Sequence, residues 1–111
     1  MVYQIFIVDL DPTKGAEMKK VRPCVVISPD EMNDNLRTVS VAPITSVPRH
    51  IPTRVFVAAS AQNGLNSDSY IALDQIKAID KTRLSTSPIG TLSRTEAALV
   101  SNVLCQMFAI S

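Results

Sequence analysis

Short apolar runs separated by polar breaks occupy most of the chain between residues 3 and 79. The run 3–9 is apolar on both faces, which predicts a largely buried strand. The run 38–44 alternates apolar with small polar residues, a pattern typical of a half-buried strand. The segments that we expect to form strands are 3–9, 21–27, 38–44, 53–58, 69–73 and 75–79.

Helix signals are concentrated near the end of the chain. Ser93 and Glu96 have the spacing of a capping box, and apolar residues from Ala97 to Met107 recur at helical spacing. We therefore expect a C-terminal amphipathic helix. A similar capping signature at 28–31 predicts a second helix that ends within one or two turns.

Polar segments rich in glycine, proline and asparagine separate these elements. Asn63-Gly64 predicts a turn with positive φ, and Gly90 is expected to interrupt regular structure. Residues 46–53 contain two prolines, an arginine and a histidine, so we expect an extended loop that forms a flexible lip.

Six short strands and one long C-terminal helix place the protein in the mainly β, α+β class. We expect a small, strongly curved sheet that closes like an SH3 barrel, with the helix packed against it. At 111 residues the chain should form one domain, 1–111, that is large enough to bury a core.

Composition excludes several classes of protein. With 46% hydrophobic and 19% charged residues, the chain has the composition of a folded protein rather than a disordered one. It has no apolar run near the roughly 20 residues that span a bilayer. Met1 leads directly into the first apolar run, without a basic segment or a cleavage site. We therefore expect no signal peptide and a cytoplasmic protein.

The cysteines and the histidine argue against a disulfide or a metal site. Cys24 and Cys105 are far apart in the sequence and lie within apolar patterns, so we expect two buried free thiols. His50 is the only histidine, and the sequence contains no cluster of cysteine and histidine. We expect neither a metal nor a cofactor.

Basic residues gather in two loops, although the net charge is only +1. This net charge argues against a protein that coats duplex DNA by charge alone. The two groups would line one basic groove if their loops meet, and would otherwise be ordinary solvated charges. The first group is Lys14, Lys19, Lys20 and Arg22, and the second is Arg49, His50 and Arg54.

Arg22 is unusual because it opens the apolar run 24–27. A guanidinium in this setting is expected to be only partly solvated, to keep its charge and to offer a rigid fork suited to phosphate. The alternative is an ordinary surface charge at a strand end.

Four segments occur in the order of a known family's signatures. They are Asp-Pro-Thr-Lys-Gly-Ala-Glu at 11–17 with Arg22-Pro23, Val-Ala-Pro-Ile-Thr-Ser at 41–46, Ala-Leu-Asp-Gln-Ile-Lys at 72–77, and Ile-Gly-Thr-Leu at 89–92. The chain resembles the MazF/PemK/Kid family of bacterial toxin-antitoxin ribonucleases along nearly its whole length. The resemblance implies the SH3-like fold of the MazF/CcdB toxin type and a homodimer, with nucleic acid lying across the two-fold interface.

The resemblance also implies site residues. Arg22 would stabilise the charged phosphorane, Thr45 would donate to phosphate or position the 2′-OH, and Glu17 would act as general base unless it is simply a solvated loop acid. Asp74 would contact RNA or instead cap a turn. The expected RNA-binding residues are Lys14, Gly15, Lys19, Lys20, Ser46, Arg49, Asp74, Gln75 and Lys77.

Two positions depart from the family pattern. Some relatives carry an arginine, thought to protonate the leaving oxygen, where this chain has Ala72. That role would then fall to Arg22 or to water. The Gly-Asp or Gly-Glu pair that customarily opens the first strand is Tyr3-Gln4 here.

The resemblance predicts a sequence-specific, metal-independent endoribonuclease. It would cut single-stranded RNA, chiefly mRNA, and arrest growth until a cognate antitoxin binds, with no membrane partner and no direct DNA binding by the toxin alone. One alternative is a non-enzymatic gyrase poison of the CcdB type, which acts through a C-terminal Trp-Gly-Ile. This chain has no tryptophan and ends Phe-Ala-Ile-Ser. Another alternative is an inactive SH3-like binding module, which would be free to lose Arg22 and Thr45.

Overall fold

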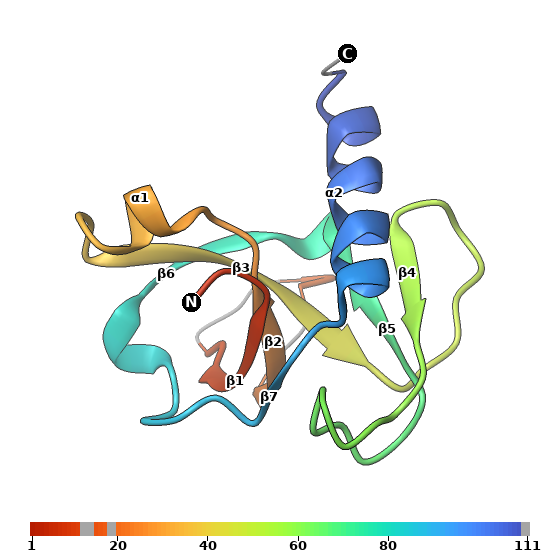
Figure 1. Ribbon diagram of the computed structural model, residues 1–111, viewed down its shortest axis with the longest axis horizontal. Helices are drawn as coiled ribbons and strands as arrows, with labels where there is room; N and C mark the ends of the chain where they lie inside the picture. Colours follow the sequence, from red (N-terminus) through yellow and green to blue (C-terminus); the bar gives the residue numbers. More distant parts are fainter. Residues whose placement is uncertain (12–14, 18–19, 110–111) are drawn as a thin grey trace.

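The computed structural model describes residues 1–11, 15–17 and 20–109 (Figure 1). Its strands are β1 Gln4–Asp9, β2 Val21–Val26, β3 Thr38–Thr45, β4 Arg54–Val57, β5 Ser69–Ala72, β6 Lys77–Asp80 and β7 Gly90–Thr91. Its helices are α1 Asp30–Asn33 and α2 Arg94–Met107, with two 3₁₀ turns, η1 Leu73–Gln75 and η2 Lys81–Arg83. The expected mainly β fold with a C-terminal helix is confirmed.

The strands form one antiparallel sheet in the order β4-β5-β3-β2-β1-β7, with β6 paired to β3 beside this path. Strand β3 is the longest and lies at the centre. Its first half pairs with β6, its middle with β2 and its end with β5. The sheet therefore curls around β3 as a half-barrel, and α2 stands against one side of it (Figure 1).

Alternation along the strands divides the buried side chains between two clusters. One face of the sheet carries Ile5, Val25 and Ile44, which pack in a cluster with Val100 of α2. The opposite face carries a second cluster that includes Cys24 and Val41. Because β2 and β3 contribute to both clusters, these two strands are buried on both sides.

The two expected capping boxes have different outcomes. At α2 the box is present, since Ser93 Oγ accepts from the Glu96 N–H at 3.1 Å and Glu96 Oε1 accepts from the Ser93 N–H at 2.8 Å. At α1 the prediction is wrong, because Pro29 is the N-cap. The Ser28 hydroxyl instead donates to Asn33 Oδ1, at 2.5 Å.

Two boundaries near the end of the sheet also differ from the predictions. Gln75 lies in η1, so the strand expected at 75–79 begins only at Lys77. Gly90 does not interrupt regular structure, because with Thr91 it forms β7 and pairs with β1. A two-residue strand is too short to show a hydrophobic period, so the sequence pattern could not reveal it.

The glycine turn is confirmed, with Gly64 at φ +70°. None of the helices in the described part of the chain has the length and apolar character needed to cross a membrane.

Candidate active site

Arg22 and Thr45 line the same pocket, at neighbouring ends of β2 and β3. The β2–β3 register pairs Cys24 with Pro43 and Val26 with Val41. Continued by two residues, this register places Arg22 opposite Thr45, with both side chains on the same face of the sheet. Both residues line an open pocket of about 380 Å³, and Ser46 lines it as well. Arg22 and Thr45, the two residues expected to act on phosphate, thus line one concave surface.

Thr45 is almost buried and has a defined hydrogen bond. Thr45 is the last residue of β3, and it is 8% exposed. The Val47 N–H donates to Thr45 Oγ1 at 3.2 Å. Since a hydroxyl accepts through its lone pairs and donates through its proton, this bond leaves the proton available to a phosphate oxygen in the pocket.

Arg22 is half-buried at the start of β2, as the apolar run behind it predicted. It is close enough to Cys24 for its positive charge to favour the thiolate. Burial of Cys24 is the larger effect and raises the pKa of this thiol to about 12. The Cys24 thiol is therefore protonated at neutral pH and serves as a small apolar side chain in the second hydrophobic cluster.

The two cysteines should differ sharply toward thiol reagents. Both are free thiols, but only Cys24 is buried, whereas Cys105 is half-buried on α2, contrary to the expected burial. At pH 8 the buried Cys24 thiol, whose pKa is raised to about 12, is almost wholly protonated and should not react while the protein is folded. We expect one reactive thiol per chain with Ellman's reagent, and two in denaturant.

A Cys105→Ser variant provides the control for this titration. It should show no reactive thiol when folded and one when unfolded. Rapid labelling of the folded Cys105→Ser protein would contradict the burial of Cys24.

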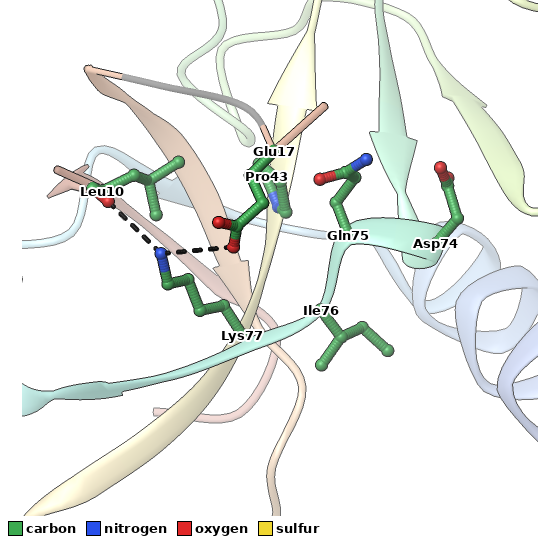
Figure 2. Close-up of a pocket in the computed structure, with 7 residues that line it drawn as sticks. All are labelled: Leu10, Glu17, Pro43, Asp74, Gln75, Ile76 and Lys77. Carbon is green, nitrogen blue, oxygen red and sulfur yellow. Dashed lines mark hydrogen bonds and ion pairs between the residues drawn. The ribbon is translucent and has the colours of Figure 1, made fainter. Parts of the chain in front are cut away.

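A second pocket of about 170 Å³ gathers four further predicted residues (Figure 2). Lys77 Nζ lies 3.8 Å from Glu17 Oε2 and donates to the Leu10 carbonyl oxygen at 3.4 Å. Gln75 and Asp74 project from the same side of η1 (Figure 2). The residues that line this pocket are Leu10, Glu17, Pro43, Asp74, Gln75, Ile76 and Lys77.

The two pockets lie along the same strand. Pro43 lines the second pocket and Thr45 lines the first, and a separation of two residues puts both on one face of β3. The structure therefore brings Arg22, Thr45 and Ser46 to one pocket and places Glu17, Asp74, Gln75 and Lys77 in the neighbouring one.

Asp74 is held by an arginine from the adjacent strand. Arg54 Nε lies 2.6 Å from Asp74 Oδ1, and Arg54 Nη2 donates to Oδ2 at 3.0 Å. These bonds hold the pKa of Asp74 below its usual value. Arg54 belongs to the second basic group, and its charge is largely matched by Asp74 rather than offered to a ligand.

The remaining predicted residues lie in loops. Gly15 and Lys20 are exposed and both have positive φ, and the Lys20 N–H donates to Asp11 Oδ1 at 3.1 Å. Arg49 is exposed in the 46–53 loop that leaves β3 at Thr45. Lys14 and Lys19 lie outside the described residues.

Sequence reasoning missed one side of the Arg22 pocket. It is lined by Leu65, Asn66 and Ser67, from the segment before β5, and by Ser69, the first residue of β5. The only signal was a run of small polar residues between two apolar positions, which is equally typical of a solvated turn. Among the residues that the structure describes, there is no group of three or more His, Cys, Asp or Glu placed to hold a metal ion.

Comparison with known proteins decides the family. Residues 2–108 match the family model described as the PemK-like, MazF-like toxin of type II toxin-antitoxin systems. The chain belongs to this family. The expectation drawn from the four sequence segments is thereby confirmed, and the CcdB alternative is not favoured.

Three members of the MazF family illustrate the likeness. The Mycobacterium tuberculosis endoribonuclease MazF9 is 35% identical over 107 residues, which cover 91% of this chain and 89% of the relative. The Staphylococcus epidermidis endoribonuclease MazF is 37% identical over 102 residues, covering 90% and 83%. The solved M. tuberculosis toxin MazF-mt6 superposes with a TM-score of 0.80 at 29% identity, covering 97% and 98%.

Proposed function

We propose that this protein is the toxin of a type II toxin-antitoxin system and acts as a sequence-specific endoribonuclease on single-stranded RNA. Family membership and the relatives named as endoribonucleases support the activity. The observation that carries the proposal for the site is that Arg22 of β2 and Thr45 of β3 line the same pocket.

These side chains suit cleavage through the neighbouring 2′-OH. The 2′ oxygen loses its proton and bonds to phosphorus, and the bond from phosphorus to the 5′ oxygen breaks as that oxygen takes up a proton. The pentavalent phosphorane between these events carries extra negative charge. Arg22 stabilises that charge through paired N–H donors, and Thr45 donates its proton to a phosphate oxygen.

Proton transfer involves the other predicted residues. Glu17 is the proposed base, and its Oε2 lies 3.8 Å from Lys77 Nζ in the second pocket. The family arginine at position 72 is replaced by a fully buried alanine, so Arg22 or water protonates the leaving oxygen. Asp74, Gln75 and Lys77 line the second pocket, where they bind the RNA beside the cut, and the basic loops hold its backbone.

The proposed partners follow from the family. The protein works as a cytoplasmic homodimer, cuts mRNA in preference to DNA because DNA lacks the 2′-OH, and is inhibited by a cognate antitoxin. An acidic, partly apolar antitoxin tail would compete with RNA for the basic side chains of Lys20, Arg22 and Arg49.

RNA cleavage in EDTA tests the activity and its mechanism together. We expect the purified protein to cut a long single-stranded RNA at defined sites in excess EDTA. The products should end in a 2′,3′-cyclic phosphate, or its hydrolysed form, and a 5′-hydroxyl. Replacing the 2′-OH at the cut nucleotide by hydrogen should abolish cleavage there. Loss of activity in EDTA, or 5′-phosphate ends, would contradict the proposed mechanism.

A further inference from the structure

Three aromatic side chains form an exposed cluster beside the Arg22 pocket. Phe56 and Tyr70 have ring centroids 5.5 Å apart at an interplanar angle of 66°, and His50 approaches Tyr70 at 6.0 Å and 87°. Phe56 is 50% exposed although it lies within a strand. Edge-to-face contacts of this kind join the rings into one unit and leave ring surface available to a ligand.

Strand register ties the cluster to the candidate active site. Thr45 pairs with Tyr70 across β3 and β5, and Tyr70 pairs with Phe56 across β5 and β4. The neighbours of these residues along their strands, including Ile44, Ile71 and Val55, pack into the cluster beneath α2. Thr45, Tyr70 and Phe56 therefore form a row on the face of the sheet turned away from α2.

The order of the strands sets the distance between the aromatic rings and Thr45. Neighbouring strands lie about 4.8 Å apart, so the Phe56 strand is about 10 Å from the strand of Thr45. The β2–β3 register pairs Cys24 with Pro43, and its extension by two residues would continue the row to Arg22 on the other side of Thr45. An RNA strand with its scissile phosphate between Arg22 and Thr45 would bring a base next to the cut over the aromatic cluster.

Packing against Tyr70 does not by itself explain why a phenylalanine occupies this exposed position. The cross-strand pair with Tyr70 stabilises the sheet, but it covers only part of the Phe56 ring. Unpaired bases stack on exposed aromatic rings irrespective of sequence, because every base has an apolar face. Arg49, exposed in the adjoining loop, adds a positive charge for the RNA backbone.

We propose that Phe56, supported by Tyr70, is a stacking platform for an unpaired RNA base next to the scissile phosphate. This inference rests on the proposed endoribonuclease function and adds a recognition site to it. Phe56 binds the substrate here by stacking and takes no part in proton transfer.

A binding cycle between the ring and the base tests the platform. The probe is a short single-stranded RNA spanning a cut site mapped with the wild-type protein, with the reactive 2′-OH replaced by hydrogen. Phe56→Ala should weaken its binding about 5- to 100-fold, and Phe56→Tyr should bind nearly as well as wild type. Removing the stacked base from the RNA should cause a similar loss, and Phe56→Ala should then have little further effect.

Phe108→Ala is the matched control, because Phe108 is also an exposed phenylalanine, 62% exposed at the end of α2. It should bind the probe as wild type does. Salt dependence separates stacking from charge. Phe56→Ala should leave the salt slope unchanged, whereas Arg49→Ala should reduce it by about 0.7.

The outcomes distinguish the two levels of the proposal. If the wild-type protein cuts no RNA, the proposed function fails and the platform with it. If the wild type cuts RNA but Phe56→Ala binds the probe normally, the platform alone is wrong. The platform is also wrong if Phe56→Ala weakens binding by the same factor whichever one base is removed from the RNA. It is wrong as well if the variant binds the probe normally and changes only the oligomeric mass measured by sedimentation, which would assign Phe56 to a contact between copies.

Discussion

Replacing Arg22 by alanine is expected to lower kcat/KM for RNA cleavage about 100- to 1,000-fold, which corresponds to about 2.7 to 4 kcal/mol of lost transition-state stabilisation. Arg22 lines the pocket, whereas the hydrophobic clusters are built by fully buried residues such as Val25 and Val26. The free energy of unfolding should therefore change little. Single-turnover cleavage of one mapped site, together with urea unfolding, measures both quantities.

Two further variants separate geometry from charge in this prediction. Arg22→Lys keeps the positive charge but loses the paired donors, so it should remain well below wild type. Arg37→Ala removes an exposed arginine just before β3, at the end of that strand far from Thr45, and should cleave normally. Wild-type cleavage by Arg22→Ala would remove Arg22 from the mechanism.

Replacing Gly64 by alanine is expected to lower the free energy of unfolding by at least about 2 kcal/mol. Gly64 has φ +70°, which is unfavourable for alanine, and an added Cβ would lie 2.1 Å from the Ile89 carbonyl oxygen. Relief of this overlap requires two backbone segments to separate where β7 joins the sheet. Equilibrium unfolding in urea, monitored by circular dichroism, measures the loss.

Gly15→Ala is the matched control, because Gly15 has a similar φ of +58°. Among the described residues, no atom would lie within 4 Å of its added Cβ. This variant should lose only the cost of the left-handed conformation, about 1 to 2 kcal/mol. If both alanine variants lost the same stability, the close backbone approach at Gly64 would have no energetic consequence.

Most strands and the long helix could be predicted because their sequence signals lie within the elements themselves. The apolar runs of β1, β2 and β3 and the capping box of α2 depend on neighbouring residues, so their existence could be inferred without the tertiary structure. Elements that form only through contacts with residues distant in the sequence could not be inferred in this way. Strand β7 forms because β1 lies beside it, and the Ser28 hydroxyl bonds to Asn33 instead of capping α1.

The candidate site follows the same division. Arg22 was identified from its place before an apolar run, and Thr45 from a family signature. Their meeting in one pocket depends on how β2 and β3 pair, which single-strand patterns do not specify. Likewise, the sequence did not reveal that Arg54 is committed to Asp74, because those residues meet only where β4 reaches the turn after β5.

The position of β3 between three partner strands separates two kinds of evolutionary change. Arg22 lies in β2 and Thr45 in β3, and both strands have partner strands on either side. A shift of either strand would therefore disturb the hydrophobic clusters. The segments 46–53 and 65–68 lie outside the strands and tolerate substitution and insertion far more readily. Under the proposed function, preference for one RNA sequence over another would drift between lineages through these loops while the proposed bond-breaking residues are retained.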